Sequence, residues 1–288
     1  MNAFYLINKP LWITSFDVIR VLKKKLQIKR IWHAWTLDPL ASGLLLIATG
    51  NYTKLLSYCI IKEKTYSFDI HLNGISPSYD LGTKVEYLNS EKQEFLKKNL
   101  FKKEIENLIE KKYLWDIIQI PPKYSALKIW GKRALDRVIS WESFEIKERN
   151  VFIYHFEIKE FSYPIVSCEA EVSSGTYIRS FAYDIGQDLW SGWYIGRLCR
   201  TKLGSISLEE AQDLDCFDQR KKYSEKKIFW DSRIISVSDE VLEKLYSWQN
   251  VIWDFPFEKD IPLFIEKNGE IVSVCLYQDN LLIPKRKI

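Results

Sequence analysis

The stretch His33-Ala34-Trp35-Thr36-Leu37-Asp38-Pro39-Leu40-Ala41-Ser42-Gly43 is the most informative segment of the 288-residue chain. An aspartate before a proline, followed by small residues and a glycine, predicts a tight loop. The loop leads into the apolar run Leu44 to Ile47, which predicts a buried strand. Taken alone, Asp38 is most simply a turn residue, so its chemical role depends on the segments around it.

Three more segments place polar groups in predicted loops. Residues 8–15 (NKPLWITS) lie near the start, and residues 119–128 (QIPPKYSALK) predict a rigid Pro-Pro turn with aromatic and basic groups. Residues 173–180 (SSGTYIRS) follow directly after an alternating strand pattern at residues 166–172. Read alone, each segment predicts only a loop, and Arg179 is expected to take part in a surface or structural ion pair.

The remaining patterns predict class α+β, with a mixed, largely antiparallel sheet and flanking helices. Helices are expected at residues 16–26, capped by Ser15, at 91–112 and at 240–246. Strands are expected at residues 64–72, 151–158, 166–172 and within 262–282, the last with turns at Asn268-Gly269 and Asp279-Asn280. A polar stretch over residues 208–238 predicts the boundary between domains 1–212 and 213–288.

Composition narrows the class of protein further. The chain has 42 Lys and Arg against 38 Asp and Glu, and it is 47% hydrophobic, which is typical of a soluble globular protein. Its apolar runs are too short to span a bilayer, and the first residues lack a cleavable leader. Five dispersed cysteines and three dispersed histidines favour neither a disulfide scaffold nor a metal site. We therefore expect a cytoplasmic protein without a metal.

Taken together and in order, the segments resemble those of the TruB-type tRNA pseudouridine synthases. That family carries KPxGxTS, GHxGTLDPxAxG, a K-x-Y strand, QxPPxYSAxK, SxGTYIRS and LxRTxxG. The matching stretches here are residues 9–15, 33–43, 64–66, 119–128, 174–180 and 198–204. Each motif is weak alone, but six in order form a specific signal that covers the chain to about residue 211.

The resemblance implies a fold, an activity and partners. It implies a pseudouridine synthase core over residues 1–212 and a small C-terminal α/β, PUA-like RNA-binding domain over residues 213–288. The implied activity isomerises uridine-55 in the T loop of tRNA to pseudouridine after base flipping, without a cofactor or metal. The implied partner is the T-arm stem-loop of tRNA, with no membrane or protein partner, and the chain is expected to be a monomer.

The resemblance also assigns roles to individual residues. Asp38 matches the family's invariant aspartate, and Arg179 holds the place of the cation that keeps this carboxylate ionised. Tyr66 matches the tyrosine that stacks on the target base and later helps to remove the C5 proton. The implied substrate-binding residues are His33, Lys9, Tyr177, Leu198 and Lys64. Basic candidates for contact with RNA phosphates are residues 23–25, 29, 30, 123, 128, 133 and 285–287.

Three other functions fit parts of the sequence. A related synthase could act on another RNA or with a guide RNA, and a non-catalytic protein could bind or fold tRNA. The intact Asp38, Tyr66 and Arg179 argue against a pure binder. A carboxylate hydrolase would need a second acid near the first. The only motif-linked candidate is Asp80, the one residue kept from the family's TDT…D stretch, which appears here as residues 76–80 (SPSYD).

Tryptophan stands where the family commonly has glycine. The chain has 11 Gly and 11 Trp, whereas average usage predicts roughly 20 glycines. The positions concerned are Trp12, Trp32, Trp35, Trp115, Trp141, Trp190, Trp193 and Trp248, with Trp130 as a further candidate. Glycine at such sites serves positive φ or close backbone approach. We therefore hypothesise that UGA codons, written here as tryptophan, are read as glycine in the source organism.

Overall fold

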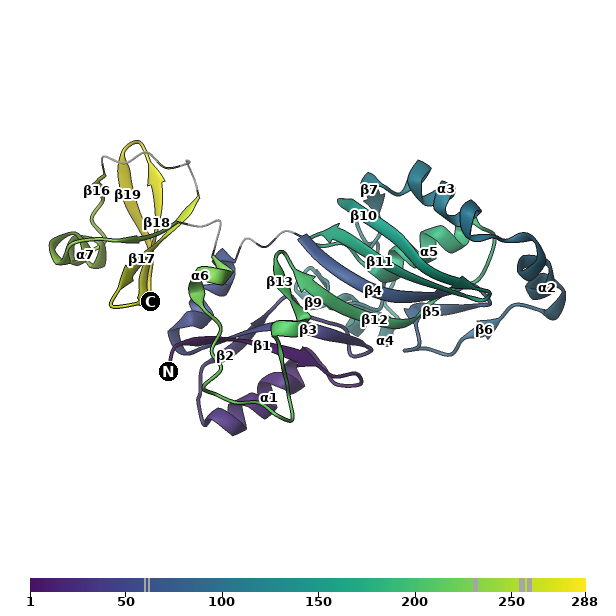
Figure 1. Ribbon diagram of the computed structural model, residues 1–288, viewed down its shortest axis with the longest axis horizontal. Helices are drawn as coiled ribbons and strands as arrows, with labels where there is room; N and C mark the ends of the chain where they lie inside the picture. The colour runs from purple at the N-terminus through teal and green to yellow at the C-terminus, as the bar shows by residue number, and fades with distance from the viewer. Residues whose placement is uncertain (60, 62, 230–232, 254–256, 258–260) are drawn as a thin grey trace.

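Two β-sheets form the framework of the protein in the computed structural model (Figure 1), which describes residues 1–59, 61, 63–229, 233–253, 257 and 261–288. The first sheet has 12 strands. They are β1 (Ala3–Lys9), β2 (Ile31–Ala34), β3 (Ala41–Thr49), β4 (Glu63–His71), β5 (Gly74–Asp80), β6 (Glu86–Tyr87), β7 (Trp115–Gln119), β10 (Arg149–Ser162), β11 (Ile165–Ser173), β12 (Trp193–Leu203), β13 (Ile206–Ser207) and β14 (Gln212–Asp213).

The main path of this sheet is β14-β1-β3-β12-β4-β11-β10-β7. Most neighbouring strands are antiparallel, whereas β1 with β14, β12 with β3 and β12 with β5 are parallel. The predicted α+β class with a mixed, largely antiparallel sheet is therefore confirmed. The strands predicted at residues 64–72, 151–158 and 166–172 correspond to β4, β10 and β11.

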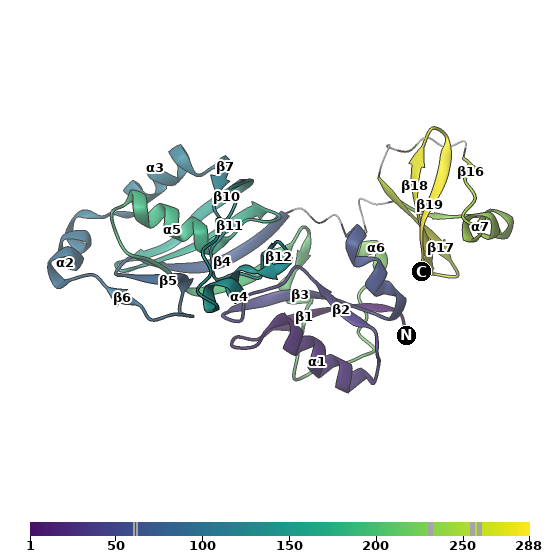
Figure 2. The same ribbon diagram turned by 180° about the vertical axis from the view of Figure 1, so that it is seen from behind.

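Helices pack on different parts of this sheet, as Figures 1 and 2 show. The first is α1 (Ser15–Leu26), which buries Val18, Ile19 and Leu22 against the apolar face of β1 and β3. Further along the chain, α3 (Lys102–Lys112) packs on β10, and α5 (Ile178–Asp188) packs on β12 and β5. The other helical segments are η1 (Gly50–Lys54), η2 (Leu56–Tyr58), α2 (Ser90–Asn99), α4 (Ala134–Ile139) and η3 (Leu208–Glu210).

Two predictions about helices were wrong in detail. The cap of α1 is Thr14, whose side chain accepts from the backbone N–H of Asp17, and not Ser15, which is buried within the first turn. The helix predicted at residues 91–112 is two helices, α2 and α3. Leu100 between them is extended and buried, and Glu104 accepts from the backbone N–H of Phe101 to start α3. Burial of Leu100 and this new cap end the first helix.

The C-terminal part forms a separate five-stranded sheet in the order β15-β17-β18-β19-β16. Its elements are β15 (Arg233–Ser236), α7 (Asp239–Tyr246), β16 (Val251–Ile252), β17 (Pro262–Lys267), β18 (Glu270–Gln278) and β19 (Leu281–Lys287). The predicted helix at 240–246 and the strands within 262–282 are confirmed.

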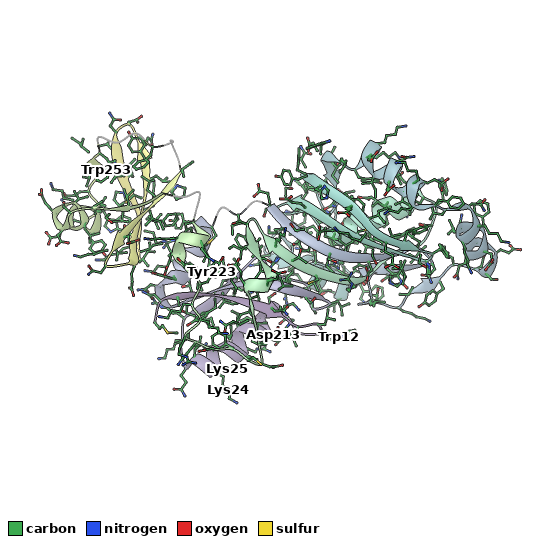
Figure 3. The ribbon with its side chains drawn as sticks, in the orientation of Figure 1. Trp12, Lys24, Lys25, Asp213, Tyr223 and Trp253 are labelled. Carbon is green, nitrogen blue, oxygen red and sulfur yellow. The ribbon has the colours of Figure 1, made fainter. Side chains whose placement is uncertain are left out.

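The two sheets share apolar contacts. Phe229, which follows α6 (Glu225–Ile228), stacks on Phe264 of β17 with ring centroids 4.2 Å apart. The backbone N–H of Ile271 donates to the Tyr52 hydroxyl at 3.3 Å. Figure 3 labels Tyr223, whose backbone N–H donates to Phe4 O of β1 at 2.8 Å. Segments as far as residue 229 therefore pack on the first sheet. Residues 230–232 lie outside the described part of the chain. The predicted division between domains at residue 212 stays a prediction.

Seven tryptophans lie in the left-handed backbone region. They make up seven of the twelve non-glycine residues with positive φ in the described part of the chain. They are Trp12 (φ 70°), Trp35 (53°), Trp115 (74°), Trp130 (47°), Trp141 (56°), Trp190 (52°) and Trp248 (60°). A Cβ atom in this region crowds the following carbonyl, so glycine is the residue that usually occupies it.

Three of these tryptophans end helices in the same way. In α4, α5 and α7 the residue after the C-cap is Trp141, Trp190 and Trp248, and its N–H bonds a carbonyl of the last turn. The N–H of the following residue bonds one carbonyl earlier, which completes the Schellman motif whose left-handed position is usually glycine.

A hairpin turn also places a tryptophan at a position where glycine is usual. Trp130-Gly131 joins β8 (Lys128–Ile129) to β9 (Lys132–Arg133), and both turn residues have positive φ. The same two-residue geometry carries Asn268-Gly269 between β17 and β18, which is the composition such turns prefer. The backbone thus supports glycine at seven positions. Trp32 and Trp193 lie within strands at ordinary φ and gain no such support.

Candidate active site

A cavity of about 300 Å³ opens where the loop of residues 35–40 meets β4, β12 and the start of α5. Asp38, Tyr66, Arg179 and Leu198 line it, together with Lys64 and Tyr177 among others. Six of the eight predicted site residues therefore share one cavity, although they come from four separate segments of the chain. Its volume is in the range of small-molecule sites.

Asp38 and Arg179 form an ion pair in this cavity. The Arg179 Nη2 lies 2.7 Å from Asp38 Oδ2. Arg179 is in the first turn of α5 and only 3% exposed, whereas the Asp38 side chain is 32% exposed. The guanidinium is thus fixed within the protein, and the carboxylate remains accessible from the cavity.

A second carboxylate contacts the same guanidinium. The Arg179 Nη1 lies 3.4 Å from Asp80 Oδ2 and donates to the carbonyl oxygens of Ser78 and Tyr124, each at 3.0 Å. Asp80 is buried at the end of β5 and accepts from the Ser78 hydroxyl at 2.6 Å. Asp80 does not line the main cavity but only a small neighbouring one of about 40 Å³. It balances Arg179 and is poorly placed as the second acid of a hydrolase.

The buried side chains of Ser15 and Lys9 form hydrogen bonds with the loop that carries Asp38. The Ser15 hydroxyl donates to Leu37 O at 3.1 Å and accepts from Leu37 N–H at 2.9 Å. Lys9 is fully buried, and its Nζ donates to Pro10 O, to Ile13 O and, at 3.4 Å, to Pro39 O. Burial lowers the pKa of Lys9 to about 8, although the Asp38 charge opposes this shift. These contacts fit a role for Lys9 in positioning the loop of Asp38, because its ammonium donates to backbone carbonyls.

Arg200 also forms hydrogen bonds with the backbone on either side of Asp38. It is buried in β12, where its Nε donates to Leu44 O at 2.8 Å and its Nη2 donates to Trp35 O at 2.9 Å. Parallel pairing of β12 with β3 sets Arg200 beside Gly43, where a Cβ atom would lie 2.3 Å from Arg200 O. Gly43 is therefore required for this close approach of the two strands.

The walls of the cavity are basic and apolar. The Lys64 Nζ donates to the Ser174 hydroxyl at 2.7 Å, and burial, together with the nearby Arg200, lowers the pKa of Lys64 to about 8. Tyr66 on β4 and Leu198 on β12 are mostly buried and supply the aromatic and aliphatic surfaces. Of the three cations that line the cavity, Arg179 is paired with Asp38 and Arg200 donates to backbone carbonyls, so Lys64 is the cation best placed to meet a phosphate of a ligand.

The segment that carries Arg179 is fastened to the Pro-Pro segment. The buried Gln119 accepts from Tyr177 N–H at 2.8 Å and donates to Tyr177 O at 3.1 Å. The Ser180 hydroxyl donates to Ile120 O at 2.7 Å. These contacts connect two predicted motifs and fix the start of α5.

His33 and Lys9 are the predicted substrate-binding residues that do not line the cavity. His33 lies on β2, its ring stacked with Trp32 at 5.4 Å between centroids. Burial, with a smaller effect of Arg200, lowers the pKa of His33, so the neutral ring is favoured. Its buried Nδ1 has no hydrogen-bond partner in the described part of the protein.

The contacts of four residues of the site were not predicted from the sequence. Ser15, Gln119 and Arg200 act through backbone atoms, and Asp80 contacts Arg179 from a separate strand. Each lies in a motif stretch or beside one, but only the strand register shows what it contacts. In the described residues no group of three or more His, Cys, Asp or Glu is arranged to hold a metal. No described helix is long and apolar enough to cross a membrane.

The comparisons with known proteins assign this protein to the class of pseudouridine synthases, and the fold and the paired aspartate agree with that class. A family model described as TruB family pseudouridylate synthase (N terminal domain) matches residues 23–178. The chain belongs to this TruB family. The tRNA pseudouridine synthase B of Clostridium tetani is 38% identical over 215 residues, which cover 75% of this chain and 72% of the relative. The protein of that name from Francisella philomiragia is 33% identical and covers 99% and 94%.

Solved structures agree on the fold. A structure described as an H/ACA RNP bound to a substrate RNA containing 2'-deoxyuridine superposes with a TM-score of 0.70. It covers 99% of this chain and 84% of its own at 18% sequence identity. A Cbf5-Nop10-Gar1 complex gives the same TM-score at 19% identity. At this identity the likeness supports the fold alone.

Proposed function

We propose that this chain converts uridine-55 in the T loop of tRNA to pseudouridine. The proposal is supported by relatives that are named tRNA pseudouridine synthase B. The matches to two of them extend over 72% and 94% of the relative's length. The observation that carries it is the Asp38–Arg179 ion pair, 2.7 Å long, in a cavity also lined by Tyr66. A tRNA-binding role without catalysis would not require an accessible carboxylate held in this way.

The reaction needs one accessible carboxylate and a pocket for a flipped nucleoside. A uridine must leave the RNA stack to reach Asp38, and Tyr66 and Leu198 offer aromatic and aliphatic surfaces for its base. Asp38 then either attacks the sugar at C1′ or removes a proton from it. In either case the C1′–N1 bond breaks and its electron pair stays on the uracil.

The second half of the reaction rejoins the base. The uracil turns within the cavity and C5 forms a bond to C1′. If Asp38 has attacked the sugar, its bond to C1′ breaks in this step; if it has removed a proton, it returns that proton to the sugar. The C5 proton is then lost and N1 gains one. Atoms and electrons balance within the nucleoside, so no oxidant, reductant or added group is consumed. Arg179 holds the Asp38 carboxylate throughout, and Tyr66 is the candidate to assist removal of the C5 proton.

Further proposals concern the rest of the chain. Residues 213–288 are proposed to bind RNA as a PUA-like domain, and the protein is proposed to act as a monomer. A tRNA substrate supports a cytoplasmic location. These statements rest on the family resemblance and on the names of relatives.

Chemical mapping of pseudouridine tests the proposed function. A tRNA transcript is incubated with the full chain, and a second transcript carries cytidine at position 55. We expect a single new pseudouridine at position 55 in the first transcript and none in the second. Modification at another uridine would refute the T-loop assignment, and no modification of any transcript would refute the activity.

A further inference from the structure

A groove outside the catalytic cavity lies between α1 and β2. It encloses about 510 Å³ and is lined by Phe16, Arg20, Lys23, Lys29, Arg30 and Trp32, among others. Figure 3 labels the neighbouring Lys24 and Lys25 at the end of the same helix. Trp32 belongs to β2, which leads directly into the loop of Asp38. The groove is therefore adjacent along the chain to the segment that carries the catalytic aspartate.

Most of the cations in this groove are not used within the protein. In the described part of the chain, Lys23 and Lys29 form no ion pair, and both are exposed. The Arg30 Nη1 donates to the neutral Asn51 Oδ1 at 3.0 Å. Arg20 differs, because it pairs with Asp17 at 2.7 Å. The positive charge of the groove is thus available to an external anion.

The same charge continues onto the C-terminal sheet. Lys54 in η1 donates to Lys287 O on β19 at 2.8 Å. Arg30 contacts the other end of η1, because its Nη1 donates to Asn51 and its carbonyl oxygen accepts from Gly50 N–H at 2.8 Å. Lys54 thus lies between Arg30 and the segment of Arg286 and Lys287, and the pKa of Lys54 is lowered, chiefly by burial and then by the charges of Arg30 and Arg286. Figures 1 and 2 both show the C-terminus next to the N-terminal end of the first sheet. We define Lys23, Lys29, Arg30, Lys54 and Arg286 as the cationic track.

We propose that the cationic track binds the sugar–phosphate backbone of the RNA substrate outside the loop that enters the catalytic cavity. The identity of the RNA rests on the proposed function. Like charges held close together repel one another, and a row of phosphates relieves this repulsion. The track joins both sheets, so one RNA segment can contact the catalytic part and the C-terminal part at once.

Backbone binding fits the groove better than stacking of bases. The ring of Phe16 already carries the Arg20 guanidinium at 5.0 Å, and Trp32 is stacked on His33. Lys23 and Lys29 form no ion pair in the described part of the chain, and Arg30 and Lys54 contact only neutral groups through the hydrogen bonds given above, so their charges can meet phosphates. None of the five track residues is a tryptophan, so glycine at position 32 would leave the track unchanged.

A triple variant tests this proposal in the full chain. Lys23→Gln, Lys29→Gln and Arg30→Gln together remove three cations and keep most of each side chain. We measure the affinity for a tRNA transcript over a series of salt concentrations. The proposal predicts an affinity loss of about 10-fold or more and a less steep salt dependence, by about one charge per removed contact. The rate of pseudouridine formation at tRNA concentrations far below saturation is expected to fall in step with the affinity.

A matched control separates local binding from net charge. Lys97→Gln, Lys98→Gln and Lys103→Gln remove three exposed cations from α2 and α3, far from the track in Figure 1. This control is expected to retain the affinity and salt dependence of the unchanged protein. Unchanged affinity in the track variant, or an equal loss in the control, would overturn the proposal. Absence of pseudouridine with normal, track-dependent RNA binding would instead refute the proposed function alone.

Discussion

Replacing the seven left-handed tryptophans with glycine is expected to raise the free energy of unfolding. A left-handed backbone costs a residue with a Cβ atom about 1–2 kcal/mol, and the greater freedom of glycine in the unfolded chain returns roughly 0.5–1 kcal/mol. The net gain is about 0.5–1 kcal/mol per site. Six of the seven indoles are 61–95% exposed, so little apolar burial is lost at those sites.

The sites are distributed over both sheets, so their effects are expected to add. Seven sites then give roughly 4–7 kcal/mol, which is comparable to the whole stability of an ordinary domain. Thermal and urea unfolding of the chain as printed and of the seven-glycine variant measures this difference. We expect the melting temperature to rise by roughly 10 °C or more.

Alanine provides the matched control. A seven-alanine variant loses the same indoles but keeps each Cβ atom, so it retains the backbone strain and is expected to gain far less. If the alanine and glycine variants were equally stable, the gain would come from removing indoles and not from φ. A glycine variant less stable than the printed chain would refute the backbone argument altogether.

Three other predictions follow from the structure. Burial lowers the pKa of Lys64 to about 8, so its ammonium is present below that pH and lost above it. RNA affinity is therefore expected to fall between about pH 7 and 9. The Lys64→Arg variant stays charged over this range, so its affinity is expected to change less with pH. Profiles of affinity against pH that run parallel for the two proteins would contradict this. Asp80→Asn leaves Arg179 with one carboxylate fewer, so we expect a loss of about 3 kcal/mol in unfolding free energy and slower single-turnover conversion. An unchanged rate would remove Asp80 from the positioning of Arg179. Mass spectrometry of the protein from its source organism is expected to read glycine at the seven left-handed positions, and tryptophan there would refute the codon hypothesis.

Much of the fold followed from periodic patterns. The strands β4, β10 and β11 and the helix α1 were predictable because their apolar residues repeat with the period of the element. The break between α2 and α3 was not, because no glycine or proline marks it and it depends on burial of Leu100. The residues that lie in contact at the site were predictable only as motif matches, since nothing local in the sequence brings Asp38 to Arg179.

Other features depend on tertiary contacts. Lys9 was predicted to bind substrate, but strand pairing and the loop of Asp38 enclose its ammonium among carbonyl oxygens. Asp80 reaches Arg179 because β5 pairs with β12, and its sequence neighbours do not reveal this. The excess of tryptophan was visible in composition, whereas its link to positive φ required the backbone.

The central claim is that Asp38, held by Arg179, performs the chemical step on a flipped uridine. Single-turnover conversion of tRNA labelled with tritium at C5 of uridine measures this step directly, because rejoining through C5 releases the label. Asp38→Asn is expected to bind tRNA with unchanged affinity and to lose about 10⁴-fold or more of the rate. Release of tritium by this variant at a rate near that of the unchanged protein would contradict the claim.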